Sequence, residues 1–163
     1  MQDWQKTTAR TLKGGRVVKA ELPRGLEGRT LCRWCELEVP PRRRTFCSDF
    51  CVDQWRLRTD TSYLRDKTFA RDLGVCAACH TDTVAAYLDI KRSRGTARLR
   101  KLQHWGLKAL TRKTLWDADH IVAVVEGGGA CDLSNIRTLC LLCHRRETAE
   151  LRSRRTRPPH AVD

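Results

Sequence analysis

Asp119 and His120 stand side by side in WDADHIVAV, residues 116–124, a stretch otherwise made mostly of apolar and β-branched residues. Asn135 and His144 follow along the chain, and His144 comes directly after a C-x2-C pair. A carboxylate beside an imidazole can transfer protons or supply oxygen and nitrogen ligands to a metal ion. The competing interpretation is an edge strand whose polar side chains face water. Taken alone, the nine residues of the stretch favour neither interpretation over the other.

The elements that must position these side chains are two short strands and a helix. The segment EGGGACDLSN after the first strand predicts a glycine turn and a polar loop, and IRTLCLLCHRRETAELRSRR predicts a second strand followed by a long helix. Successive residues of a strand point to opposite faces of the sheet. Asp119 and His120 can therefore address one reacting group only if the strand frays or bulges there, which is what we expect.

The nine cysteines are spaced for metal binding. Eight of them form four close pairs, Cys32/Cys35, Cys47/Cys51, Cys76/Cys79 and Cys140/Cys143, and Cys131 is left over. Four pairs of thiolates predict two structural Zn²⁺ sites, because ligation by cysteine alone is typical of closed sites without an open catalytic position. The spacing leaves open which pairs share an ion.

The charge balance predicts a polyanionic partner. Lys and Arg number 32 against 19 acidic residues, which gives a net charge of +13. We expect this partner to be DNA, with RNA as the alternative. Residues 91–113 hold nine Lys or Arg and no acid, interleaved with leucines and Trp105. The competing interpretations of that segment are a solvated helix face and a surface that binds membranes or calmodulin-like partners.

A location inside the cell and a reducing environment are expected. The longest apolar runs have five residues, far below the roughly 20 that cross a bilayer. The N-terminal residues lack the apolar core of a secretory signal. We therefore predict a cytoplasmic protein, or one of the nucleoid in a prokaryote, with no membrane contact and with its cysteines as thiolates. The sequence leaves the oligomeric state open.

A family resemblance runs through these motifs. DHIVAVVEGGGACDLSNIRTLCLLCHRR resembles the HNH endonuclease motif, in which Asp-His, a central Asn and a final His lie on a zinc-braced ββα-metal hairpin. From residue 32 to about 150, the order of CRWC, FCSDFC, SYLR, GVCAAC and TLCLLCH resembles the C-terminal HNH domain of the Ran-binding-type zinc-finger annealing helicases. Only about 30 residues precede this region, so we expect a standalone protein without a helicase motor.

The resemblance implies a role for each matching side chain. Asp119 and His144 correspond to ligands of a catalytic divalent metal, His120 to the general base, and Asn135 to the residue that braces the loop carrying the base. The resemblance also implies one zinc site made of Cys76, Cys79, Cys140 and Cys143, and another made of Cys32, Cys35, Cys47 and Cys51. Phosphate contacts are expected from Arg92, Arg94, Arg98, Arg100, Lys101, Arg145 and Arg146.

The expected fold is a small zinc-stabilised α+β protein, with an N-terminal four-cysteine zinc module, a helical segment and a zinc-braced ββα-metal HNH domain. The predicted parts are a flexible basic arm (1–30), the zinc module (31–60), the HNH domain (61–155) with a basic helical insertion (84–113), and a flexible tail (156–163).

The function that the resemblance implies is hydrolysis of DNA phosphodiester bonds by an endonuclease dependent on Mg²⁺ or Mn²⁺. The products would carry 5′-phosphate and 3′-hydroxyl ends, and selectivity for DNA structure is a further implication. The alternative is a non-catalytic zinc-finger protein that binds nucleic acid, which leaves Asp119, His120 and His144 without a purpose. A zinc nucleobase deaminase is excluded because Val75 and Leu139 stand where its P-C-x-x-C signature needs proline.

Overall fold

The computed structural model describes residues 17–129 and 131–156, and it divides into two compact units. One unit extends to Thr61 and the other begins at Ser62. Each is described by itself below. In the part of the chain that the structure describes, no helix combines the length and the apolar character needed to cross a membrane.

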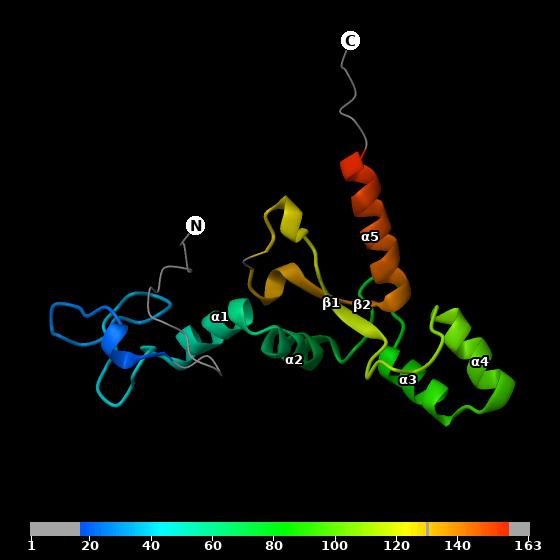
Figure 1. Cartoon of the computed structure of the whole chain (residues 1–163), viewed down its shortest axis with the longest axis horizontal. Coiled ribbons are helices and arrows are strands. Elements are labelled where there is room, and N and C mark those ends of the chain that lie inside the picture. The colour runs from blue at the N-terminus through cyan, green and yellow to red at the C-terminus, as the bar shows by residue number, and fades with distance from the viewer. Residues whose placement is uncertain (1–16, 130, 157–163) are drawn as a thin grey trace, which may run out of the picture. The chain divides into compact units, whose positions relative to one another are not determined.

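The first unit is organised around the first two cysteine pairs. The helices of its described residues are the 3-10 helix η1, Lys19–Glu21, and helix α1, Asp49–Thr59 (Figure 1). The small buried centre consists of Cys32, Val39 and Cys51, against which Trp34 and Phe46 pack. A centre this small buries little apolar surface, so the unit depends on its cysteine cluster for stability.

Residues 17–30, the described part of the predicted arm, are joined to one another and to the residues that follow by backbone contacts. Backbone bridges join Arg24 to Thr30 and Leu31 to Glu38 in antiparallel fashion, and the backbone N–H of Leu31 donates to the carbonyl of Pro23. Thr30 is buried. Isolated bridges, and not a regular ladder, hold this segment. Such bridges need no alternation of apolar and polar residues, and the sequence shows none here. Residues 1–16 of the predicted arm and 157–163 of the predicted tail lie outside the described residues.

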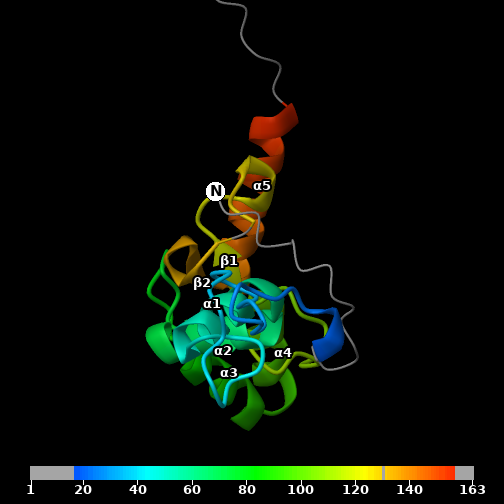
Figure 2. The same cartoon turned by 90° about the vertical axis from the view of Figure 1, so that its left-hand side faces the viewer.

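The second unit contains four α-helices in its described part and one two-stranded sheet. These are α2 (Thr61–Asp72), α3 (Thr83–Arg92), α4 (Gly95–His104), β1 (Trp116–His120), β2 (Ile136–Cys140) and α5 (Leu141–Thr156). In both views the two strands lie side by side and α5 continues directly from the end of β2 (Figures 1 and 2). The order of strand, loop, strand and helix that the sequence predicts is confirmed.

The two strands pair in antiparallel register, with Asp119 opposite Arg137 and His120 opposite Ile136. Four of the five residues of β2 are buried, and Leu139 and Cys140 belong to the core of the unit. The core gathers Cys76, Ile90, Leu102, Trp105, Leu115, Leu139, Cys140, Leu141 and Cys143. Half of the second cysteine cluster therefore comes from the strand and helix that carry the candidate site.

The two helices of the predicted basic insertion begin and end at recognisable signals. The Asp82 side chain caps α3 by accepting the backbone N–H groups of Val84 and Ala85, both at 2.9 Å. Gly95, with a φ of 53°, is the first residue of α4. Glycine adopts this left-handed conformation without a steric penalty, which lets the chain turn between α3 and α4.

Helix α2 ends in a turn that ties it to the second strand. Leu73 and Gly74 both have positive φ, of 53° and 76°, and they reverse the chain after Asp72. The Asp72 carboxylate then accepts the backbone N–H of Thr138 at 3.1 Å and its hydroxyl at 2.9 Å. Arg71 donates to the carbonyl of Ile136 at 2.6 Å. These contacts fix β2 against α2.

Candidate functional site

The candidate site lies where the sheet meets α5. Asp117 and Asp119 are two residues apart on β1, so their side chains share one face of the strand. His144, in the first turns of α5, faces both carboxylates. Its Nε2 atom lies 3.6 Å from Oδ1 of Asp119, and its Nδ1 atom lies 3.5 Å from Oδ2 of Asp117. The predicted pair of Asp119 and His144 is thus brought together across 25 residues of chain.

Arg137 holds Asp119 from the neighbouring strand. Its Nε atom donates to Oδ2 of Asp119 at 3.1 Å, and its Nη2 atom donates to Oε2 of Glu147 at 3.0 Å. The two carboxylates contribute to raising the pKa of the Arg137 guanidinium, although burial acts in the opposite direction as the largest single influence. Because Arg137 occupies Oδ2, the Oδ1 atom of Asp119 is the oxygen turned toward His144.

His120 is the last residue of β1 and pairs with Ile136 in the regular register, so the expected fraying or bulge at this position is not present. It lines a cleft of about 270 Å³ together with Asp119, His144, Arg137 and Glu147. Asp119 and His120 therefore reach the same cleft although they are adjacent in the strand.

Asn135 holds the loop that follows His120. Its Oδ1 atom accepts the backbone N–H of Val122 at 2.8 Å, and its Nδ2 atom donates to the carbonyls of Val122 and Gly128, each at 3.1 Å. Its own carbonyl accepts the backbone N–H of Ile121 at 2.8 Å. All of these bonds go to the backbone of the loop, so the side chain fixes the path of the chain beyond His120.

Asp117 is the residue of the site that the sequence interpretation missed. Its carboxylate lies between His144 and two arginines, with Nη2 of Arg112 at 2.5 Å and Nη1 of Arg65 at 3.5 Å from its Oδ1 atom. Its spacing of two from Asp119 on a predicted strand was a usable signal, since it places both carboxylates on one face. Nothing in the local sequence indicates that a helix histidine faces them.

The donor set fits a divalent metal ion. The 3.6 Å between Oδ1 of Asp119 and Nε2 of His144 is within the roughly 4 Å that two ligands of one ion span when each lies about 2.0–2.2 Å from it. One carboxylate and one imidazole are ligands that Mn²⁺, Zn²⁺ and Mg²⁺ sites combine with water. Asp119 and His144 are the residues that would hold the ion, and both line the cleft.

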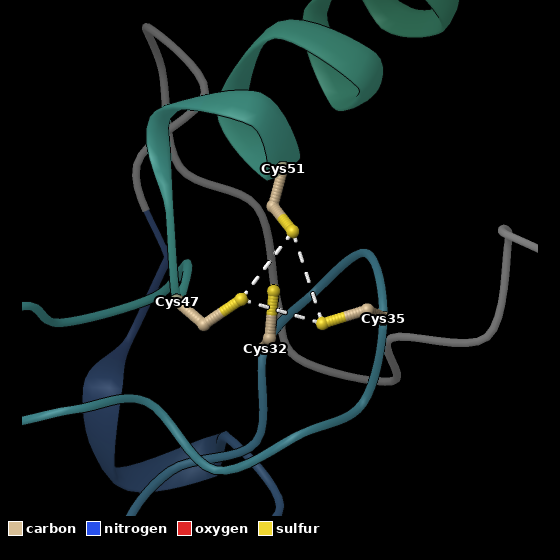
Figure 3. A group of neighbouring side chains, drawn as sticks. All are labelled: Cys32, Cys35, Cys47 and Cys51. Atoms are coloured by element: carbon tan, nitrogen blue, oxygen red, sulfur yellow. Dashed lines mark hydrogen bonds between the residues drawn. The ribbon is translucent and has the colours of Figure 1, made fainter.

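The first cysteine cluster is formed by Cys32, Cys35, Cys47 and Cys51, with the four Sγ atoms directed toward one another (Figure 3). Sγ of Cys47 is 3.4 Å from those of Cys35 and Cys51, and all four sulfurs lie within 4.8 Å. Burial raises the pKa of Cys35 to about 12. Ligation of a cation would therefore displace a tightly held proton from this thiol.

The second cluster joins Cys76 and Cys79 to Cys140 and Cys143 with the same spacing of sulfurs, within 4.8 Å. Sγ of Cys140 accepts the backbone N–H of Cys143 at 3.4 Å. The side-chain hydrogen bond from Thr81 lowers the pKa of Cys79 to about 6, which favours the thiolate. Two four-cysteine clusters able to hold zinc are thus present, in the combination that the family resemblance implies.

The basic residues predicted to contact phosphates fall into two groups. Arg92, Arg94, Arg98 and Arg100 make no ion pair with any residue that the structure describes. Three others are engaged within the protein: Nζ of Lys101 lies 2.6 Å from Asp89, Nη1 of Arg145 donates to the Trp105 carbonyl at 3.0 Å, and Nε of Arg146 lies 3.9 Å from Glu150. The first group is the one available to an anionic partner.

Comparison with known proteins adds to this geometry. The HNH endonuclease family model matches residues 107–150, which contain β1, the loop, β2 and most of α5. The DNA annealing helicase and endonuclease ZRANB3 of Mus musculus is 34% identical over 145 residues, which are 76% of this chain and 14% of that protein. ZRANB3 of Bos taurus is 30% identical over 167 residues, which are 86% of this chain and 16% of that protein.

Among solved structures, the crystal structure of the human ZRANB3 HNH domain is 31% identical, with a TM-score of 0.45, and the match covers 61% of this chain and 99% of that one. The chain spans only 14% and 16% of the two curated relatives described above. The likeness therefore concerns only a small part of those proteins. From the family match and these relatives, we conclude that the chain carries an HNH endonuclease domain, one that resembles the HNH domain of ZRANB3.

Proposed function

We propose that the protein is a metal-dependent endonuclease that hydrolyses phosphodiester bonds of DNA and leaves 5′-phosphate and 3′-hydroxyl ends. The observation that carries this proposal is the meeting of Asp119, His120 and His144 in one cleft. The relative ZRANB3 is named a DNA annealing helicase and endonuclease, which supports phosphodiester hydrolysis as the reaction. The net charge of +13 supports a polyanionic substrate.

In this proposal His120 is the general base. A neutral imidazole at the rim of the cleft takes a proton from the attacking water, and a base placed in this way contributes about 10²–10⁴-fold to the rate. The bonds from Asn135 to the loop at Val122 and Gly128 keep the backbone after His120 in place. Asn135 is thus a positioning residue, which acts through the backbone and not on the substrate.

Asp119 and His144 would hold the divalent ion, which when bound neutralises charge that develops on the phosphate and stabilises the leaving oxygen. Arg137 orients Asp119 through its bond to Oδ2 and leaves Oδ1 for the ion. Asp117 faces Nδ1 of His144 and so favours the tautomer with its proton on Nδ1, which leaves the Nε2 lone pair for the ion. Arg137 and Asp117 thus orient the two metal ligands and do not contact the phosphate themselves.

The rival proposal is a non-catalytic protein that binds nucleic acid through its zinc modules. One experiment separates the two: supercoiled plasmid is incubated with zinc-loaded protein, with and without Mg²⁺ or Mn²⁺. Omitting the ion is preferable to adding a chelator, because a chelator would also strip the cysteine clusters. Nicked or linear plasmid only in the presence of added ion supports the endonuclease, and binding without cleavage supports the rival.

Two further measurements test the proposed DNA substrate and the proposed chemistry of the cleaved ends. Plasmid nicks that DNA ligase seals without prior treatment carry 5′-phosphate and 3′-hydroxyl ends, so sealing supports the proposed polarity of cleavage. A parallel reaction with a structured RNA of equal length separates DNA from RNA as the substrate. Degradation of RNA alone would contradict the proposal.

A further inference from the structure

The cleft that contains the proposed metal ligands continues along helix α5 beyond them. The helix lines it with His144, Glu147, Thr148, Leu151 and Arg154, which recur at intervals of three and four residues and so share one face. Ten residues separate the first of these from the last, which is about 15 Å of helix. The cleft is therefore longer than the metal site, and Arg154 lies at its far end.

Arg154 is held less firmly than the other arginine of the cleft. Among the described residues, Arg137 and Arg154 are the two arginines of the lining. The Arg137 guanidinium, 25% exposed, donates to Asp119 and Glu147 at 3.1 and 3.0 Å. Nη2 of Arg154 lies 3.8 Å from Oε1 of Glu126, and these two side chains are 62% and 45% exposed. Because water screens an exposed ion pair, it contributes little. Arg154 can therefore exchange Glu126 for another anion.

A polyanion in the cleft needs cations at more than one place. Three carboxylates and two guanidinium groups line the cleft in its described part, so the lining alone does not attract a phosphate. None of the basic residues that the sequence predicts to contact phosphates belongs to the lining. The proposed divalent ion supplies positive charge beside His144, and Thr148 and Leu151 beyond it are uncharged. Arg154 is the cation that remains for a second phosphate.

The distance between the two places corresponds to a short piece of nucleic acid. The helix advances about 15 Å from His144 to Arg154. Along one strand of a duplex each nucleotide advances about 3.4 Å, so about four nucleotides cover the same length. A strand whose scissile phosphate lies at the metal site thus brings another phosphate to Arg154.

We propose that Arg154 binds a phosphate about four nucleotides from the scissile one, and that Glu126 holds the Arg154 side chain until this phosphate replaces it. The contact positions the strand in the cleft and sets a minimum length of nucleic acid on one side of the cut. It carries no sequence information, because every nucleotide has the same phosphate. This inference rests on the proposed function, since it concerns the substrate of the same cleft.

The first test measures binding of a uniform DNA duplex by full-length, zinc-loaded protein without added Mg²⁺ or Mn²⁺, so that the DNA stays intact. Arg154→Gln is expected to reduce the slope of log K against log salt by about 0.9, the contribution of one neutralised phosphate. Arg152→Gln makes the same charge change on the same helix outside the lining, and it should reduce the slope less. Equal reductions by the two variants would overturn the phosphate contact.

The role of Glu126 has a matched control on α5. Glu126→Gln is expected to tighten binding of the same duplex roughly 2- to 5-fold, because Arg154 then leaves no carboxylate when it meets the phosphate. Glu150→Gln removes an acid that lies outside the lining and pairs with Arg146 at 3.9 Å, and it should tighten binding less. Equal tightening by both variants would contradict the hold of Glu126 on Arg154.

The second test locates the phosphate along the strand. Cut positions are mapped on an unmodified duplex with Mn²⁺, and single uncharged methylphosphonate linkages are then placed at successive positions around one cut. Wild-type cleavage at that cut is expected to fall roughly 2- to 5-fold when the neutral linkage lies about four nucleotides away. Arg154→Gln should be insensitive to that linkage, whereas Arg152→Gln should keep the sensitivity.

Binding and cleavage together distinguish failure of the phosphate contact from failure of the endonuclease. Sensitivity to the same linkage in Arg154→Gln and in wild-type protein would overturn the contact alone, because cleavage itself is then intact. A reduction of the salt slope specific to Arg154→Gln, combined with no cleavage under any added ion, would support the contact and overturn the endonuclease.

Discussion

His144 is the residue on which the candidate site depends most, because it is the contact between the helix and both strand carboxylates. Its Nε2 atom faces Asp119 and its Nδ1 atom faces Asp117. The two nitrogens of an imidazole have different roles, because the hydrogen-bond partner of one nitrogen decides whether the other can bind a metal ion. The proposed base His120, the proposed ligand His144 and the residue Asp117 that orients it should therefore respond differently to substitution.

His120→Ala is expected to keep the fold and DNA binding while lowering cleavage by about 10²–10⁴-fold, because it removes the proposed base and no bond of the core. The measurement is the nicking rate of supercoiled plasmid at saturating Mn²⁺, with DNA affinity determined in parallel. His104→Ala, outside the cleft, is the matched control. Cleavage by His120→Ala at the wild-type rate would remove His120 from the mechanism.

Asp117→Asn is expected to raise the Mn²⁺ concentration needed for half-maximal cleavage by about 10–100-fold, with a smaller effect at saturating ion. The amide keeps the shape of the side chain but loses the charge that orients His144. Direct Mn²⁺ binding, measured by electron paramagnetic resonance, should shift in parallel. Asp89→Asn, whose carboxylate pairs with Lys101 outside the cleft, controls for the loss of one acid. An unchanged Mn²⁺ titration would contradict the positioning role.

Among the elements, helix α2 acts as the support of the second strand. Asp72 sits at the C-terminal end of the helix, where the helix dipole disfavours a carboxylate. The hydrogen bond from Arg71, which is its largest influence, and those from Thr138 lower the pKa of Asp72 nonetheless. Arg71 also donates to the Leu133 carbonyl at 2.7 Å, in the 3-10 helix η3, Leu133–Asn135, that carries Asn135. The end of α2 thus fixes both β2 and the short helix η3 that carries Asn135.

Asp72→Asn is expected to destabilise the second unit by about 1.5–3 kcal/mol, the range for hydrogen bonds to a charged group. Because folding lowers the pKa of Asp72, its stabilisation is present above the unfolded-state pKa and is lost as the pH falls through the folded-state value. Denaturant unfolding should therefore show a constant difference between the two proteins at neutral pH and a smaller one in acid. A difference that grew on acidification would contradict the assignment.

The basic helix α4 presents arginines that have no acidic partner in the described structure. Replacing Arg98 and Arg100 together by Ala should reduce the slope of log K against log salt by roughly 2 for duplex DNA, since each neutralised phosphate contributes about 0.9. Lys101→Ala should change the slope less, because Asp89 and Ser93 already hold its ammonium. Fluorescence anisotropy at several salt concentrations gives the slopes. Equal effects of the two changes would show that the internal ion pair opens on binding.

The molecule as a whole consists of two units, each with its own four-cysteine cluster. No described residue of the first unit lines the cleft. A zinc site of this type contributes roughly 10–16 kcal/mol of apparent binding energy to folding. Loss of one cluster should therefore unfold one unit and spare the other.

Elemental analysis is expected to find two zinc ions per chain. Cys47→Ser should lower the zinc content toward one and keep Mn²⁺-dependent nicking, whereas Cys140→Ser should lower it equally and abolish nicking, because Cys140 ends β2 and begins the turn into α5. Near-ultraviolet circular dichroism and the plasmid assay report the two effects. Two zinc ions bound to either variant would show that the substituted cysteine is not a ligand.

Local patterns in the sequence were sufficient for the order of elements and for the ligand types. The strand, loop, strand and helix around Asp119 follow from β-branched runs, a glycine turn and a helix-compatible tail, all of which are local signals. The spacing of the cysteine pairs is equally local. Without the family resemblance, the pairing of Cys76/Cys79 with Cys140/Cys143 stays open, because spacing says nothing about contacts across 61 residues between Cys79 and Cys140.

Tertiary structure decided the rest. The place of Asp117 beside His144 and the hold of Arg137 on Asp119 depend on strand register and on how α5 packs against the sheet. Sequence periodicity tells which residues share a face of one strand, but not which helix covers that face. Likewise, residues 17–30 are held by isolated bridges between segments that carry no strand pattern of their own. These bridges join near neighbours, Arg24 to Thr30 and Leu31 to Glu38, but no alternating pattern marks the segments, so only the folded chain shows which residues pair.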